Sequence, residues 1–250
     1  MARLAEPLAT RIADLAIRAA CRFAARRIDL RVEGLEHLPA SGPAIIAARH
    51  FHHFYDGCVL VAVVPRTLKI LVTLDWMNNA TGLRLMRGAC KIVNWPVVVR
   101  SDSEARHGGA TAAGRQLLLA TRECVDLLRA GQLVLVFPEG YPTIDPSFTP
   151  KTGDDAFLSF QRGFLRFAAL AERDGITRVP IVPVGLEYQR GNRWRVTVRF
   201  GLPVTRLPDV DIGDQVTAIE EEVRRLSGLE HAVDSNEKAG NETPIEVVRT

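Results

Sequence analysis

The chain has 250 residues, of which 47% are hydrophobic and 24% charged, and these proportions are typical of a globular protein and exclude a disordered one. The formal net charge of +3 is mildly basic, so charge alone does not favour nucleic acid over a membrane or an anionic substrate. We expect one domain with its own core. Four widely spaced cysteines predict reduced, mostly buried thiols in a cytosolic protein: Cys21, Cys58, Cys90 and Cys124.

The first predicted element is a helix over residues 4–25. One face of this helix collects the apolar positions, and arginines dominate its charge, which predicts an amphipathic segment (1–30) at an anionic membrane interface. A helix docked on the protein's own core is the alternative interpretation. The apolar positions are Leu4, Leu8, Ile12, Leu15, Ala19 and Phe23, and the opposite side carries Arg3, Asp14 and Arg18.

Short β-branched segments then alternate with helical ones, which predicts an α/β fold with a mixed, mostly parallel sheet flanked by helices. The expected strands are 44–48, 68–74, 97–99, 133–137, 179–187 and 194–200. The expected helices are 112–130, capped by Gly131, a second from Asp154 or Asp155 to Gly175, and a third over 214–226. Residues 31–231 form the predicted domain, and the polar stretch 232–250 is a predicted loose tail.

The apolar strand 44–48 leads directly into three histidines and an acid: His50, His52, His53 and Asp56. Reacting groups collect at the carboxyl ends of strands in α/β sheets, and a histidine beside a carboxylate is a common general base near neutral pH. The alternatives are a helix-capping aspartate with surface histidines, and a metal site. Neighbouring histidines on a strand end point in different directions, and the chain has no second ligand cluster of the usual spacing, so we expect no metal.

Two further segments pair an apolar strand with polar residues. Residues 134–140 form a strand that ends in Phe137-Pro138-Glu139-Gly140, and Glu139 would lie beside the histidines if the two strands are neighbours. A tight turn with an exposed acid is the alternative. Residues 95–100 end an apolar strand with Arg100, whose guanidinium is suited to binding a phosphate.

In this order the blocks resemble the glycerophospholipid acyltransferase family, the PlsC-like enzymes that acylate glycerol phosphate and lysophosphatidate. The match covers roughly residues 34–201, and F-P-E-G is its most specific piece. The matching residues are His50 with Asp56, Gly88 leading to Arg100, Phe137-Pro138-Glu139-Gly140, and 179–184, V-P-I-V-P-V.

The resemblance implies that His50 takes the proton of the acceptor hydroxyl and that Asp56 orients its imidazole. It also implies that Arg100, Glu139 and Gly140 position the acceptor's headgroup. The family usually has four residues between His and Asp, whereas five separate His50 from Asp56, so His52 stays an alternative base. The F-P-E-G block is normally followed by Thr or Ser and then Arg, and this chain has Tyr-Pro-Thr there.

These features predict an O-acyltransferase that moves a fatty-acyl group from acyl-CoA or an acyl carrier protein to a lyso-lipid or glycerol-phosphate acceptor, without a cofactor. The sequence has no G-x-S-x-G elbow, which argues against a serine hydrolase. No apolar run reaches the roughly 18 residues of a membrane span. We therefore expect a peripheral protein on the cytoplasmic face of the membrane, with no nucleic-acid partner. A non-catalytic lipid-binding homologue and a metal-dependent hydrolase are the competing interpretations.

Overall fold

The computed structural model describes residues 7–74, 77, 79–98 and 109–229. Its centre is a six-stranded sheet in the order β1-β8-β7-β2-β6-β3. All neighbouring strands are parallel except β7 and β8, which form an antiparallel pair, so the predicted mixed, mostly parallel sheet is confirmed. The strands are β1 (Asp29–Glu33), β2 (Ala44–Ala48), β3 (Leu68–Ile70), β6 (Leu133–Val136), β7 (Ile181–Gln189) and β8 (Arg195–Phe200).

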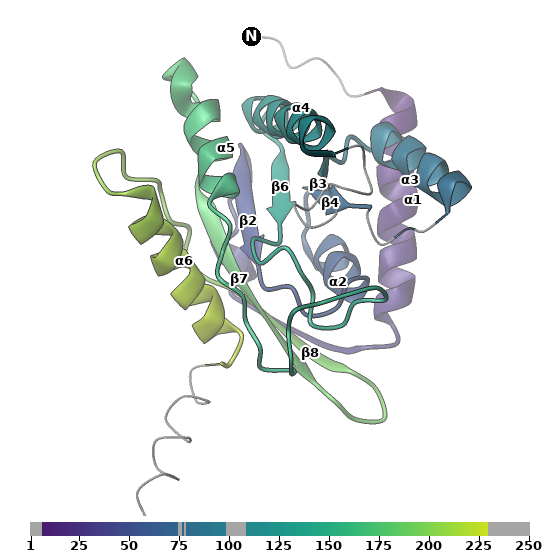
Figure 1. Cartoon of the computed structure of the whole chain (residues 1–250). Helices are drawn as coiled ribbons and strands as arrows, with labels where there is room; N and C mark the ends of the chain where they lie inside the picture. The colour runs from purple at the N-terminus through teal and green to yellow at the C-terminus, as the bar shows by residue number, and fades with distance from the viewer. Residues whose placement is uncertain (1–6, 75–76, 78, 99–108, 230–250) are drawn as a thin grey trace, which may run out of the picture.

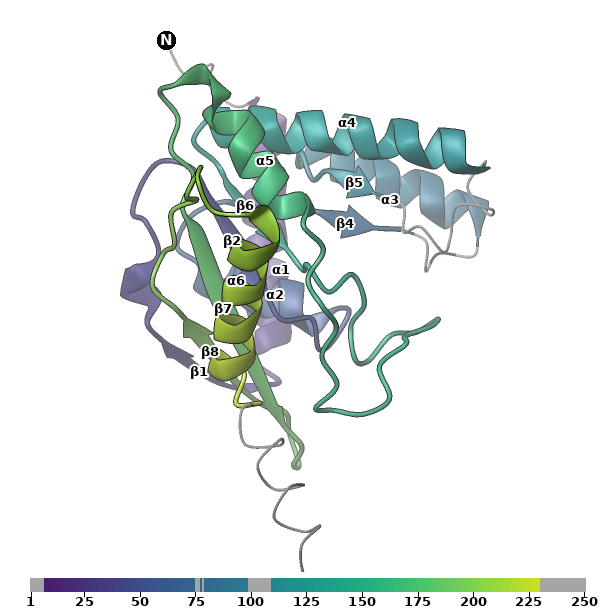
Figure 2. The ribbon, with the colours of Figure 1, turned by 60° about the vertical axis from the view of Figure 1, so that its left-hand side comes forward.

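Helices cover both faces of this sheet (Figure 1). One face is packed by α1 (Leu8–Ala25) and α2 (Tyr55–Val63), and the other by α4 (Gly109–Arg129), α5 (Gly163–Ala171) and α6 (Ile212–Leu226). A two-stranded sheet of β4 (Val72–Thr73) and β5 (Val97–Val98) lies apart from the main one. Figure 2 shows α4 and α3 (Ala80–Ile92) projecting together to one side of the six-stranded sheet. Two short 3-10 helices, η1 (Leu35–His37) and η3 (Glu172–Asp174), complete the described elements.

The central strand β2 explains why the core has two halves. Its side chains alternate, so Ile46 packs on the α1–α2 side, and Ile45 and Ala47 pack on the α4–α6 side. All five residues of β2 are buried, as expected for a parallel strand that is covered on both faces. The core therefore fixes the place at which β2 ends. The segment that carries His50, His52, His53 and Asp56, called here the histidine segment (50–56), begins just after it.

Several predicted boundaries need correction. The expected strand 68–74 is broken at Leu71, since β3 pairs with β6 and β4 pairs with β5. The expected helix from Asp154 or Asp155 is wrong over its first part, because α5 begins only at Gly163. The backbone nitrogens of Leu158 and Phe160 instead donate to distant glutamates, which holds the segment in an irregular path.

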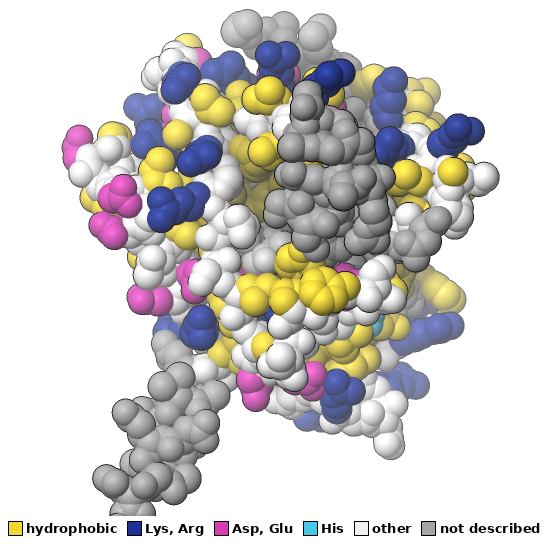
Figure 3. Space-filling model, viewed as in Figure 1, with side chains coloured by type: hydrophobic (Ala, Val, Ile, Leu, Met, Phe, Trp, Pro, Cys, Tyr) yellow, Lys and Arg dark blue, Asp and Glu magenta, His cyan; other side chains and the backbone are white. Residues whose placement is uncertain are grey.

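The amphipathic N-terminal helix is present, and the side that faces the protein carries Asp14 and Arg18 together with Ile17 and Cys21. Asp14 accepts an ion-paired hydrogen bond from the buried Lys69 at 2.9 Å, and Arg18 donates to the carbonyls of Val64 and Arg66, both at 2.6 Å. The predicted apolar face is exposed instead of packed on the core, with exposed fractions from 58% to 71% at Leu8, Ile12, Leu15 and Phe23. Figure 3 shows Lys and Arg side chains among hydrophobic ones along the edge where α1 and α3 lie.

The predicted tail 232–250 and Arg100 lie outside the described residues.

Candidate active site

The site begins where β2 ends. His50 follows the strand after one residue, and Asp56 lies in the first turn of α2, where the positive end of the helix dipole favours a carboxylate. The loop between them turns back, so that His50 Nδ1 lies 2.9 Å from Asp56 Oδ2. The spacing of five residues therefore brings the two side chains into direct contact.

Asp56 is fully buried and engaged at both oxygens. Oδ2 accepts hydrogen bonds from His50 Nδ1 and from the backbone nitrogens of Phe51 (2.7 Å) and His52 (2.9 Å). Oδ1 accepts one from the hydroxyl of Tyr188 at 2.6 Å, at the end of β7. A carboxylate that is surrounded by donors accepts from Nδ1–H, and this places the lone pair of His50 on Nε2.

His50 is held by its ring as well as by its hydrogen bond. The imidazole stacks on Phe137, with ring centroids 4.1 Å apart and planes 15° apart. The side chain keeps 14% of its surface exposed, in contrast to the fully buried Asp56. In the described part of the chain, Nε2 of His50 has no hydrogen-bond partner, and the buried Asp56 sets the tautomer, an arrangement suited to a general base.

His52, the alternative base, is placed differently. Asp56 bonds the backbone nitrogen of His52, and the ring Nδ1 of His52 accepts from the backbone nitrogens of Phe54 and Tyr55 at 3.2 and 3.4 Å. Burial lowers the pKa of His52 below its ordinary value, and the neighbouring Asp56 opposes this shift. The imidazole of His50, and not that of His52, is therefore the one oriented by the carboxylate.

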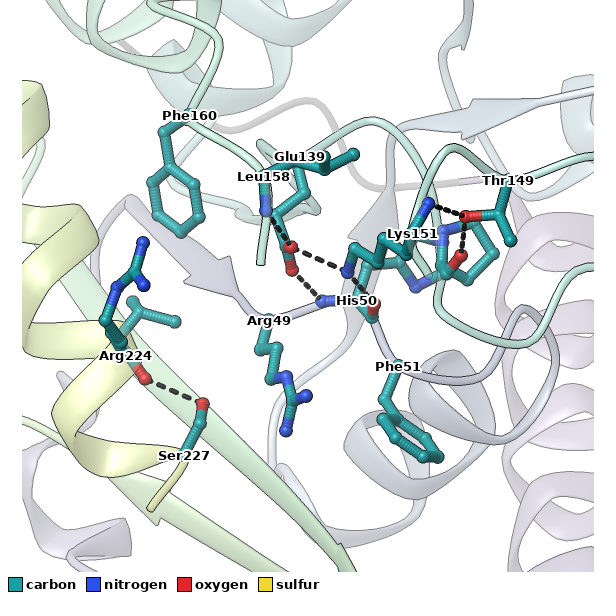
Figure 4. A network of polar contacts seen from close by, with 12 residues as sticks. Arg49, His50, Phe51, Glu139, Thr149, Lys151, Leu158, Phe160, Arg224 and Ser227 are labelled. Carbon is teal, nitrogen blue, oxygen red and sulfur yellow. Dashed lines mark hydrogen bonds and ion pairs between the residues drawn. The ribbon is translucent and has the colours of Figure 1, made fainter. Parts of the chain in front are cut away.

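Glu139 and Gly140 lie at the end of β6, which is the neighbour of β2 in the sheet. Gly140 has a φ of +77°, so glycine is favoured at this turn. The Glu139 carboxylate is buried, and internal donors occupy both oxygens: Oε1 accepts from the His50 nitrogen at 2.7 Å, and Oε2 accepts from the Leu158 nitrogen and from Lys151. Figure 4 shows Glu139 and Lys151 in contact with each other and with the backbone of His50. The predicted contact of Glu139 with substrate stays a prediction, and the carboxylate is turned toward the protein.

Two residues of this site escaped the sequence analysis, Lys151 and Tyr188. Lys151 lies in a loop without periodicity, and the only local signal is that lysine is rare in this arginine-rich chain. Tyr188 lies one residue beyond the predicted strand 179–187, and it faces the site only because β7, which extends to Gln189, is the neighbour of β2. Burial and the nearby Asp56 raise the pKa of Tyr188 well above its ordinary value, so its hydroxyl keeps the proton that it donates.

In the described part of the chain, no three His, Cys, Asp or Glu side chains gather in a way that would hold a metal ion.

A family model described as Acyltransferase matches residues 29–187, a span that contains His50, Asp56, Glu139 and Lys151. The chain belongs to this acyltransferase family. Uncharacterized proteins of Mycobacterium bovis and Mycobacterium tuberculosis are each 30% identical to it over 158 residues, and one of Mycobacterium leprae is 31% identical over 159 residues. Each match covers 63% of this chain but only 37% of the relative, so the chain spans little more than a third of these proteins.

The fold of this chain is also found in a solved structure. The crystal structure of the 1-acyl-sn-glycerophosphate (LPA) acyltransferase PlsC from Thermotoga maritima superposes with a TM-score of 0.56 at 19% sequence identity. The alignment covers 88% of this chain and 80% of the PlsC chain. At this identity the likeness establishes the shared fold, and the predicted PlsC-like architecture is confirmed.

Proposed function

We propose that this acyltransferase moves a fatty-acyl group from an acyl thioester, acyl-CoA or acyl carrier protein, to a hydroxyl of a glycerolipid such as lysophosphatidate, with His50 as the general base. The observation that carries the proposal is the hydrogen bond of 2.9 Å between His50 Nδ1 and the buried Asp56, which leaves Nε2 free. The family membership and the fold shared with PlsC support the reaction class.

The chemistry needs no covalent enzyme intermediate, because a thioester is already activated. His50 Nε2 accepts the proton of the acceptor hydroxyl while the hydroxyl oxygen attacks the thioester carbonyl. Asp56 stabilises the imidazolium that forms. The tetrahedral intermediate then collapses, the C–S bond breaks, and the thiolate leaves as a thiol after taking the proton from His50.

The test incubates the purified protein with labelled palmitoyl-CoA and a panel of acceptors: glycerol 3-phosphate, lysophosphatidate, other lysophospholipids and a non-phosphorylated lyso-lipid. General-base catalysis contributes roughly 10²- to 10⁴-fold, so His50→Ala should lose that much kcat while remaining folded. His52→Ala is the matched control and should keep most activity. Wild-type turnover by His50→Ala, together with an inactive His52→Ala, would reassign the base.

The same panel is repeated with palmitoyl acyl carrier protein as the donor. No transfer to any acceptor from either donor would favour the competing interpretation, a non-catalytic lipid-binding protein. The panel also addresses the altered segment after F-P-E-G. A preference for the non-phosphorylated lyso-lipid would mean that the acceptor site does not depend on a phosphate.

We also propose that α1 binds the surface of an anionic membrane, so that the site meets its lipid acceptor there. The exposed apolar residues of α1 lie beside four exposed arginines, Arg11, Arg22, Arg26 and Arg27. An apolar face flanked by arginines suits the headgroup region of an anionic bilayer. None of the described helices is long and apolar enough to cross a membrane.

Vesicle co-sedimentation tests this surface. Leu15 and Leu202 are equally exposed, at 68%, and Leu202 lies in the segment after β8. Leu15→Gln should weaken binding to vesicles containing phosphatidylglycerol by roughly tenfold, since burying a leucine contributes about 1.5–3 kcal/mol. Leu202→Gln should bind like the wild type. Equal loss in both variants, or none in Leu15→Gln, would remove α1 from the membrane contact.

A further inference from the structure

A buried ion pair is hydrogen-bonded to the backbone of His50. Lys151 Nζ lies 2.6 Å from Glu139 Oε2, and the side chains of both residues are fully buried. Glu139 Oε1 accepts a hydrogen bond from the His50 nitrogen at 2.7 Å, and Lys151 Nζ donates to the His50 carbonyl oxygen at 2.6 Å. The pair therefore engages both polar atoms of the His50 backbone, one with each partner (Figure 4).

The loop that carries Lys151 is built to deliver it there. Thr149 Oγ1 donates to the Pro142 carbonyl at 2.6 Å and accepts from the Lys151 nitrogen at 3.3 Å. The same loop also pairs with the histidine segment, because the Ile144 nitrogen donates to the Phe51 carbonyl at 2.7 Å. Lys151 thus reaches His50 across 101 positions of sequence as part of a hydrogen-bonded loop.

Stability alone does not account for this arrangement. Removing two charges from water costs free energy that their attraction often fails to recover, and apolar residues of similar volume commonly stabilise a fold at least as well. Burial lowers the pKa of Lys151, and the Glu139 carboxylate opposes this shift. With its side chain fully buried, Lys151 also has no free access to a bound substrate.

We propose that Lys151, through its ion pair with Glu139, is a positioning residue that holds the backbone of His50 so that the imidazole meets the acceptor hydroxyl. His50 is then fixed at its nitrogen, its carbonyl oxygen and its ring Nδ1, and its ring is stacked on Phe137. This inference rests on the proposed function, because it assumes that His50 is the base. A base displaced by about 1 Å can lose roughly 10²-fold in rate.

The experiment compares Lys151→Met, the double variant Lys151→Met with Glu139→Gln, and the control Arg206→Met. Arg206 pairs with Glu172 at 3.1 Å, and Glu172 accepts a hydrogen bond from the backbone nitrogen of Val179. Val179 lies just before β7, whereas His50 lies just after β2, so the two are at opposite ends of the parallel strands. This control removes an ion pair that also anchors a backbone group, but at a place remote from His50.

Lys151→Met should lower kcat about 10- to 100-fold, with the KM for acceptor and for donor unchanged within about twofold. It should also lower the melting temperature, because the Glu139 charge is left buried without its partner. The double variant should regain melting temperature without regaining kcat, since the His50 carbonyl still lacks the ammonium. Arg206→Met should keep the kcat of the wild type. A rise in the acceptor KM of Lys151→Met at constant kcat would place Lys151 at the substrate and overturn the proposal. Recovery of kcat together with melting temperature in the double variant would also overturn it.

A spectroscopic measurement separates this proposal from the proposed function. Long-range ¹H–¹⁵N spectra of histidine-labelled protein report the tautomer of His50, which is assigned from the signal that His50→Ala lacks. The wild type and Arg206→Met should show one Nδ1–H tautomer, and Lys151→Met should show a mixture or a shifted signal. An unchanged His50 signal in Lys151→Met refutes the positioning role. If the wild type has no transferase activity but its His50 signal still differs from that of Lys151→Met, only the proposed reaction is refuted.

Discussion

The hydroxyl of Tyr188 offers a direct measurement of what holds the site's carboxylate in place. Tyr188→Phe removes the donor 2.6 Å from Asp56 Oδ1 and keeps the ring, which stacks on Phe51 with centroids 4.4 Å apart. A hydrogen bond to a charged group contributes about 1.5–3 kcal/mol. Since the Asp56 side chain is fully buried, solvent screening does not reduce this value. The free energy of unfolding should fall by that amount.

Urea denaturation followed by tryptophan fluorescence measures the change, with an unchanged slope as the sign that the unfolded state is unaffected. In a chain of this length the melting temperature should fall by roughly 3–12 °C. Because burial raises the pKa of Tyr188, the hydroxyl keeps its proton and the loss should be constant from neutral to mildly alkaline pH. We expect kcat to fall less than in His50→Ala, since Oδ2 keeps its three donors.

The control is Tyr55→Phe on α2, which makes the same chemical change beside the site. The Tyr55 ring contacts the rings of His52 and Phe54. Among the described residues, its hydroxyl has no hydrogen-bond partner. Tyr55→Phe should therefore be close to wild type in stability. If Tyr188→Phe also stays within about 0.5 kcal/mol of wild type, the range of ordinary surface changes, the Tyr188 hydroxyl does not stabilise Asp56.

Three further predictions concern packing. A Cβ at Gly185 in β7 would lie 2.2 Å from the carbonyl carbon of Leu226, so Gly185→Ala should destabilise the protein by about 3 kcal/mol or more in urea unfolding. A Cβ at Gly88 in α3 would meet nothing within 4 Å, so Gly88→Ala should instead stabilise the protein by about 0.5–1 kcal/mol. If Gly88→Ala lost as much free energy of unfolding as Gly185→Ala, the close contact at Gly185 would not be the cause. Cys124 in α4 is fully buried, and burial raises its pKa to about 12. A thiol reagent should therefore label it only after unfolding. Rapid labelling of the native protein would contradict the burial of Cys124 under α4.

Sequence patterns located most of the elements and placed His50, the proposed base, at the end of a strand. The run of apolar residues over 44–48 identified β2, and the position of His50 after it placed an imidazole at a strand end. Gly131 was expected to end the preceding helix and has a φ of +77°. These signals are local, because they depend on periodicity and on the backbone preferences of single residues. Local signals failed at α5, whose predicted beginning ignored the distant glutamates that bind the backbone before it.

Periodicity also identified α1 as amphipathic without determining which side faces the protein. Hydrophobic burial alone would turn the apolar face inward. The structure turns it outward, because Lys69 and the carbonyls of Val64 and Arg66 provide partners for Asp14 and Arg18. Those partners lie 46 to 55 positions away in the chain, so a helical pattern cannot reveal them.

The partners of His50 and Asp56 were decided only by tertiary structure. Tyr188 reaches Asp56 across 132 positions, and Lys151 reaches His50 across 101. Both contacts exist because β6 and β7 flank β2 in the sheet, a strand order that no local pattern contains. The sequence by itself determined which residue types carry the chemistry, through composition and short-range backbone preferences. The folded sheet decided which of them meet, because hydrogen bonds of 2.6 to 2.9 Å require positions that only strand pairing and core packing provide.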